Sequence, residues 1–183
     1  IAAEELPSAF LRHATSKLRA PEDLGKIGTL GFRREALAAI SAVSRVDIRT
    51  RRREDGMGSA LHLEGGVPGP VEAAGAPEGT TILVRDLFYN TPARLKFMKK
   101  DSAETAAAAG LMQHLALSHP DVSFKFIKDG TETLHTPGDG RLDSAVYAAL
   151  GRDFARSLLP AKGRDGEVSV SGFITAPLQC RGS

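Results

Sequence analysis

The 183-residue sequence has a single cysteine, Cys180, no tryptophan and only five histidines. One cysteine excludes an internal disulfide framework, and the scattered histidines do not have the spacing of a zinc site. No apolar run approaches the roughly 20 residues that cross a bilayer, and the first residues lack the apolar core of a signal peptide. These absences predict a protein of a reducing compartment that does not span a membrane.

Neither sign of charge dominates, because 24 Lys and Arg stand against 22 Asp and Glu. The net charge of +2 does not by itself indicate a nucleic-acid partner. The sequence also has no Gly-rich Walker loop, no nucleophile elbow and no metal-spaced cluster of His or carboxylates. The residues alone therefore predict no catalytic centre, although an apolar fraction of 42% is enough for a hydrophobic core.

The hydrophobic periodicity predicts an α/β chain whose first strands form an antiparallel meander. A Gly- and Pro-rich stretch, 65–79, predicts a loop, and HTPGDGR (135–141) predicts a linker. Thr91 before Pro92 predicts a capped helix start, and Leu111, Met112 and Leu115 are expected to face inward. Helices are expected over 4–18, 34–44, a short segment from 92, 102–119 and 142–150. The first of these has Leu6, Phe10, Leu11 and Ala14 on its apolar face, and the last is closed by Gly151. Strands are expected over 46–51, 60–63, 80–87, 122–126, 133–136 and 167–175.

Two segments suggest an anion site. Thr15-Ser16-Lys17 supplies hydroxyls and an ammonium, and Gly31-Phe32-Arg33 supplies backbone amides at the start of a helix, where an anion is favoured. Arg33 and Arg34 at this helix start oppose the helix dipole unless an anion or Glu35 compensates. The alternative for both segments is an ordinary solvated surface.

Two further segments suggest contacts with nucleic acid. The run Arg49, Arg51, Arg52 and Arg53 is able to meet phosphates, and LFYNTPARLKF (87–97) can form a stacking platform beside a basic helix. The alternatives are a solvated strand end and aromatic side chains that fill the core. These segments support a second hypothesis, in which the protein is a non-enzymatic DNA- or partner-binding module.

Three long motifs, RHATSKL (12–18), TLGFRREALAAISAVSRV (29–46) and GTTILVRDLFYNTPARLKF (79–97), resemble the N-terminal ATPase region of the MutL family of DNA mismatch-repair proteins. The resemblance implies a GHKL-type (Bergerat) ATPase fold, an α/β sandwich with helices on a mixed, largely antiparallel sheet. It also implies two domains: the C-terminal portion of the ATP-binding domain with its lid over 1–137, and the beginning of an S5 domain 2-like domain over 138–183.

The resemblance implies that the parent binds Mg-ATP, forms a homodimer through its N-terminal region and couples a MutS-type mismatch-recognition protein, on DNA, to downstream repair enzymes. Its implied location is the cytoplasm and nucleoid of a bacterium or the nucleus of a eukaryote. By matched position, it implies nucleotide contacts at the lid, the phosphate-binding loop and the adenine: Thr15, Ser16 and Lys17; Leu30, Gly31, Phe32 and Arg33; Thr80 or Thr81.

The sequence departs from the family pattern at three places. Arg34 replaces the glycine of GFRGEAL. Its side chain either blocks the approach of a phosphate, which predicts impaired lid closure and is the favoured hypothesis, or reaches round and pairs with the same phosphate. The family's general-base glutamate, magnesium-binding asparagine and adenine-reading aspartate would precede Ile1, so no catalytic or metal-binding residue is assigned and no ATP turnover by this chain alone is expected. A Val-Asn-Gly-Arg segment and a γ-phosphate lysine would follow Ser183, so exposed sheet edges are expected.

Overall fold

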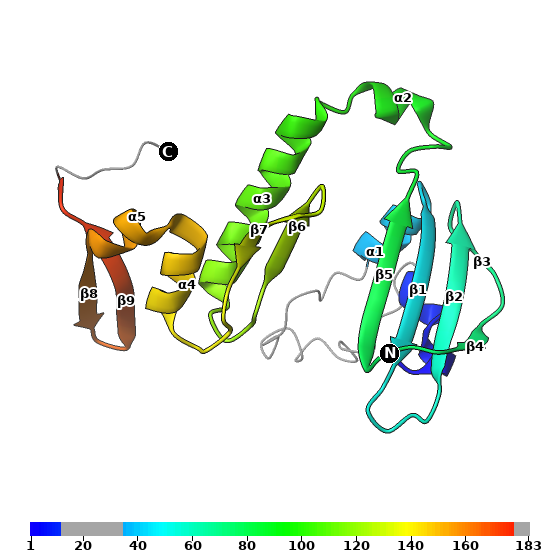
Figure 1. Cartoon of the computed structure of the whole chain (residues 1–183), viewed down its shortest axis with the longest axis horizontal. Coiled ribbons are helices and arrows are strands. Elements are labelled where there is room, and N and C mark those ends of the chain that lie inside the picture. Colours follow the sequence, from blue (N-terminus) through cyan, green and yellow to red (C-terminus); the bar gives the residue numbers. More distant parts are fainter. Residues whose placement is uncertain (12–34, 178–183) are drawn as a thin grey trace. The chain divides into compact units, whose positions relative to one another are not determined.

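The computed structural model describes residues 1–11 and 35–177 (Figure 1). The chain forms two compact units, residues 1–98 and residues 99–183, and each is described by itself. The first unit is built on a five-stranded antiparallel sheet with strand order β3-β2-β1-β5, in which β4 also pairs with β2. Its strands are β1 (Arg45–Arg51), β2 (Gly58–Glu64), β3 (Val67–Pro68), β4 (Glu72–Ala74) and β5 (Gly79–Arg85).

The antiparallel prediction is confirmed, whereas the predicted meander order is wrong, because β5 pairs with β1 and not with the preceding strands. The Gly- and Pro-rich stretch 65–79, predicted as a loop, contains β3 and β4. Both strands pair with β2, whose edge supplies hydrogen-bond partners for their backbone groups. Tertiary pairing therefore overrides the low strand propensity of this stretch.

Alternation along β1 sends its apolar side chains to one face of the sheet. Val46 and Ile48 are 1% exposed and pack with Leu61 and Leu63 of β2. Two 3₁₀ turns, η1 (Ala3–Glu5) and η2 (Ser8–Phe10), and the helix α1 (Glu35–Ser41) lie on this face. The core cluster is completed from these turns by Leu6 and Phe10.

The helix predicted over 4–18 is wrong within the described residues 4–11, where two 3₁₀ turns stand instead. Pro7 explains the interruption, because proline has no backbone N–H and its ring clashes with the preceding helical turn. The inward positions of Leu6 and Phe10 are confirmed, whereas Leu11 is 57% exposed. The rest of this predicted helix, from Arg12, lies outside the described residues.

The short helix predicted after Thr91 is confirmed as α2 (Pro92–Lys96), with proline in its first turn. The predicted capping hydrogen bond is not formed: Thr91 makes no side-chain cap bond, and its buried hydroxyl has no partner among the described residues. Its ψ of 67° departs from the extended backbone that an N-cap residue normally has. The helix therefore starts at its proline without a threonine cap.

The second unit contains three helices and two β-hairpins among its described residues. The elements are α3 (Asp101–Ser118), β6 (Lys125–Lys128), β7 (Thr131–His135), α4 (Leu142–Leu150), α5 (Arg152–Arg156), β8 (Leu158–Asp165) and β9 (Val168–Thr175). Sequence analysis missed α5 and β8, whereas α4 and its termination at Gly151 are confirmed. Ala116, Leu134 and Ala149 form the core of this unit, with Met112 and Leu117 packed against it.

Two expectations for this unit concern Leu111 and the segment 135–141. Leu111, predicted to face inward, is 60% exposed, because α3 turns Ala116 towards the core. The predicted linker 135–141 lies within the unit, where the hydroxyl of Thr136 accepts a hydrogen bond from the Phe124 amide and is 1% exposed. The beginning of this segment, at Thr136, is therefore packed within the unit.

Candidate functional site

Most of the predicted nucleotide contacts lie outside the described residues. These are Thr15, Ser16, Lys17, Leu30, Gly31, Phe32 and Arg33, and Arg34 is outside them as well. Thr80 and Thr81 are within them, on β5. The described part of the candidate site therefore consists of residues on β5 and on β1, the strand that pairs with it.

Thr80 and Thr81 lie on opposite faces of the sheet, because successive side chains of a strand alternate. Thr80 is the register partner of Thr50, and Ile82 is the partner of Ile48, so both lie on the face that carries the core. Thr81 is the partner of Arg49 on the opposite face. Of the two candidate threonines, only Thr80 is on the side of the sheet where η1, η2 and α1 pack.

The hydroxyl of Thr80 is held by a buried neighbour on β1. The Oγ1 atoms of Thr50 and Thr80 are 2.8 Å apart, and Thr50 is 1% exposed whereas Thr80 is exposed. The Thr50 hydroxyl also donates to the Gly79 carbonyl at 3.2 Å. No motif in the sequence indicated Thr50; the available signal was a polar residue at an inward position of an alternating strand.

The core-side face of β5 also has accessible aliphatic surface next to Thr80. Ile82 and Val84 are 39% and 41% exposed, although their partners Ile48 and Val46 on β1 are fully covered. Aliphatic side chains beside one oriented hydroxyl suit a flat, largely apolar ring with a polar edge. A nucleobase has this chemistry, so the described residues fit the adenine that the family resemblance implies.

The opposite face of the sheet carries a polar cleft of about 640 Å³. Within it, His62 Nδ1 lies 2.8 Å from Asp47 Oδ1, and Arg85 forms an ion pair with the other oxygen of Asp47. The hydrogen bond with His62, followed by the charge of Arg85, lowers the pKa of Asp47 below its ordinary value. Asp47 thus neutralises much of the positive charge on this face, which favours ordinary surface pairing over an anion site.

The arginine run at the end of β1 is used within the unit. Arg52 forms two hydrogen bonds with the carboxylate of Asp55, Arg51 donates to the carbonyl of Ala76, and Arg53 pairs with Glu78 at 3.5 Å. The same Arg52 pair lowers the pKa of Asp55. Three of the four arginines therefore have protein partners, which weakens the hypothesis of a phosphate-binding run.

The aromatic segment after β5 is also engaged in intramolecular contacts. The guanidinium of Arg45 lies 4.3 Å from the centre of the Tyr89 ring, and the Phe88 amide donates to the Val43 carbonyl. Arg45 in turn pairs with Glu64 and Asp86. The guanidinium of Arg45 thus covers one face of Tyr89, which weakens the hypothesis of a stacking platform.

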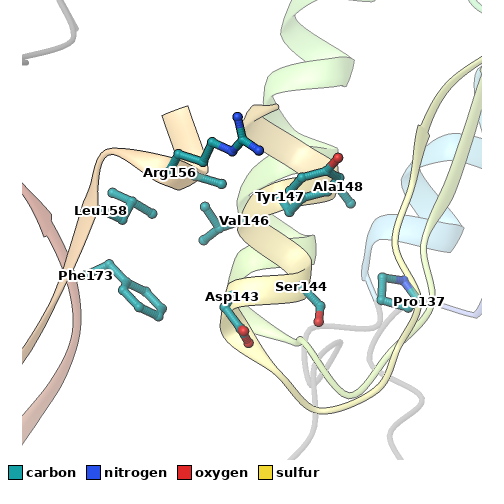
Figure 2. A pocket seen from close by; sticks show the side chains of 10 residues that line it. Pro137, Asp143, Ser144, Val146, Tyr147, Ala148, Arg156, Leu158 and Phe173 are labelled. Atoms are coloured by element: carbon teal, nitrogen blue, oxygen red, sulfur yellow. The ribbon is translucent and has the colours of Figure 1, made fainter. Parts of the chain in front are cut away.

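A second cavity, of about 500 Å³, lies in the unit 99–183 between α4, α5 and the β8–β9 hairpin. Figure 2 shows Val146, Leu158 and Phe173 around a common space, with Arg156 at one end and Asp143 at the other. Asp143 is paired with Arg141, which lowers its pKa. The lining is mainly apolar, and no sequence motif indicated it.

The described residues 1–11 and 35–177 contain neither a metal-binding cluster nor a membrane-spanning helix. There, no group of three or more His, Cys, Asp and Glu side chains is arranged to hold a metal ion. No helix of this part of the chain combines the length and apolar character needed to cross a membrane. The described residues thus supply no cluster of ligands for a Mg²⁺ ion, and no chemical step is assigned to one.

Similarity to known proteins gives the family. The DNA mismatch repair protein MutL of Agathobacter rectalis is 44% identical over 180 residues, which is 98% of this chain and 28% of that protein. The MutL of Anaeromyxobacter sp. (strain K) is 48% identical over 169 residues, 92% of this chain and 28% of that protein. The chain belongs to the MutL family. No protein-family model matches it.

Solved structures place this MutL-family chain in the ATPase domain. The structure described as the Aquifex aeolicus MutL ATPase domain complexed with ADP covers 90% of this chain, with a TM-score of 0.71 and 28% identity; the match covers 62% of that structure. The predicted α/β fold of the GHKL type is thereby confirmed. The chain spans 28% of the length of the curated MutL relatives described above.

Proposed function

We propose that this MutL-family chain contributes part of the nucleotide-binding site of a DNA mismatch-repair ATPase. The observation that supports this best is the composition of the core-side face of β5, where the oriented hydroxyl of Thr80 lies beside the accessible Ile82 and Val84. The ADP in the related Aquifex aeolicus structure supports a nucleotide as the ligand. ATP or ADP is thus the cofactor class for which this face is suited.

The proposed roles follow the chemistry of the side chains. Ile82 and Val84 contact the base, because burying a flat ring against aliphatic carbon is favourable by about 25 cal/mol per Å² of apolar area. The Thr80 hydroxyl contacts its polar edge. The phosphate contacts are proposed for residues outside the described ranges: Thr15, Ser16 and Lys17, with Leu30, Gly31, Phe32 and Arg33.

The wider role is proposed from the family. The full protein binds ATP with Mg²⁺, dimerises through its N-terminal region and couples a MutS-type protein to repair enzymes on DNA, in the compartment that holds the DNA. A domain boundary near residue 137 belongs to the same proposal. The competing hypothesis of a non-enzymatic DNA-binding module has less support, because Arg51, Arg52 and Arg53 have protein partners.

The test is the affinity of the chain for ADP, measured by isothermal titration calorimetry, in Thr80→Val and Thr81→Val variants. The loss of one hydrogen bond should weaken ADP binding by about three- to ten-fold in Thr80→Val. Thr81→Val is the matched control, because it makes the same chemical change on the opposite face. No ADP binding by the unmodified chain, or an equal loss in both variants, would refute the proposal.

A further inference from the structure

A short strap, residues 86–90, leads from β5 towards α2 and is hydrogen-bonded to the end of α1. The side-chain amide of Asn90 donates to the Ala42 carbonyl at 2.9 Å, and the Phe88 amide donates to the Val43 carbonyl at 2.7 Å. These two carbonyls directly follow the last residue of α1, where a helix leaves carbonyl groups without partners of its own. The strap therefore supplies hydrogen bonds that close this helix end.

The helix α1 has little else to hold it in place. It has seven residues, and a helix this short is at best marginally stable by itself in water. Among the described residues of the helix, Leu37 packs against the core cluster and Ala38 is 7% exposed, whereas Ile40 is 36% exposed. Its apolar contact is therefore small, so the hydrogen bonds from the strap are a substantial part of its anchorage.

The strap is held in a backbone conformation that its sequence does not favour. Asp86 and Phe88 have φ angles of 53° and 67°. Aspartate tolerates this left-handed region, whereas a bulky side chain such as that of phenylalanine is disfavoured there. A disfavoured backbone persists only where the surrounding contacts impose it. Loss of one of these contacts should therefore let Phe88 relax to a negative φ.

Arg45, at the start of β1, fastens the other end of the strap. Its Nη1 donates to Asp86 Oδ2 at 2.8 Å, and its Nε donates to Glu64 on β2 at 3.0 Å. The guanidinium also covers the ring of Tyr89. The bond at Asp86 thus joins the strap to β1, whereas the bonds at Phe88 and Asn90 join it to the end of α1.

We propose that residues 86–90 form a strained strap that opens and closes as one unit and links the position of α1 to that of α2. Opening exposes the Ala42 and Val43 carbonyls to water and relaxes Phe88, while the strands of the sheet stay paired. Because α2 begins directly after Thr91, a ligand or partner that displaces α1 changes the position of α2. By linkage, binding at α2 changes α1 to the same extent. This coupling does not depend on the proposed nucleotide site.

The experiment is native-state hydrogen exchange of the 183-residue chain, resolved by NMR, in the unmodified sequence and in Asn90→Ala. Removing one hydrogen bond should raise the exchange rates of the Ala42, Phe88 and Thr91 amides together, by about three- to ten-fold. The amides of β2 should keep their rates, because the sheet does not open. An unchanged rate at Ala42, or an equal increase in β2, would overturn the proposal.

Two further variants separate the strap from a single local bond. Gln113→Ala is the matched control, because this side-chain amide donates to the Ala149 carbonyl near the end of α4 at 3.0 Å, in the other unit. It should leave the rate at Ala42 unchanged, and faster exchange there would contradict the assignment. Asp86→Asn weakens only the fastening to β1, yet it should raise exchange at Ala42 by about two-fold, because the strap opens as one unit. No change at Ala42 in Asp86→Asn would also overturn the proposal.

Discussion

Replacing Leu63 by alanine should remove much of the stability of the unit 1–98. Leu63 is fully buried, and it packs in the cluster that joins Leu6 and Phe10 to the sheet. Truncating a buried leucine costs about 2–5 kcal/mol, and we take about 3 kcal/mol for a side chain that is enclosed from both the sheet and the 3₁₀ turns. A domain of this size has a total stability of about 5–15 kcal/mol, so the loss is a large part of it.

The control is Leu83→Ala, on the opposite face of the same sheet, where the side chain is 43% exposed. It should cost less than about 1 kcal/mol. The chain has no tryptophan, so unfolding in urea is followed by far-UV circular dichroism. Hydrogen exchange resolved by segment should show faster exchange of β1 and β2 in Leu63→Ala. Equal costs for both variants, or a cost below about 1 kcal/mol for Leu63→Ala, would refute the assigned core.

Two other changes test the polar face and a tight turn. Because the pKa of Asp47 is lowered in the fold, its ionised carboxylate stabilises the fold above the ordinary carboxyl pKa, and this stabilisation is lost as pH falls through the lowered value. The urea midpoint of unfolding should therefore fall less between pH 6 and pH 3 in Asp47→Asn than in the unmodified chain. An unchanged pH dependence would contradict this. Gly138→Ala should destabilise more than Gly140→Ala, since both have positive φ but only the Gly138 Cβ would meet a backbone atom, Ser123 N at 2.5 Å. Thermal unfolding should rank them with Gly140→Ala at about 1 kcal/mol, and equal costs would exclude the clash.

The fold was largely predictable wherever the local pattern and the tertiary structure agree. Alternation predicted β1 and β2, and helical spacing with a terminal glycine predicted α4 to its last residue. Prediction failed where distant partners decide the structure. The strands β3 and β4 exist because the edge of β2 accepts them, and Leu111 is exposed because α3 packs through other positions.

The candidate site was only partly predictable. The family motif pointed to Thr80 or Thr81 without choosing between them. Adjacent residues of a strand lie on opposite faces of the sheet, and the motif does not say which face each residue takes. The register of β5 against β1 makes the choice by pairing Thr80 with Thr50. The hydrogen bond between these residues joins positions 30 apart in the chain, so no local sequence pattern predicts it.

The sequence by itself determined the family and most of the local elements, because motifs, turn residues and hydrophobic spacing act over a few neighbouring residues. Only the tertiary structure decided the strand order, the pairing of the arginine run and the face of the sheet on which Thr80 lies. The physical reason is that these depend on which backbone edges and which buried polar groups meet across long sequence separations.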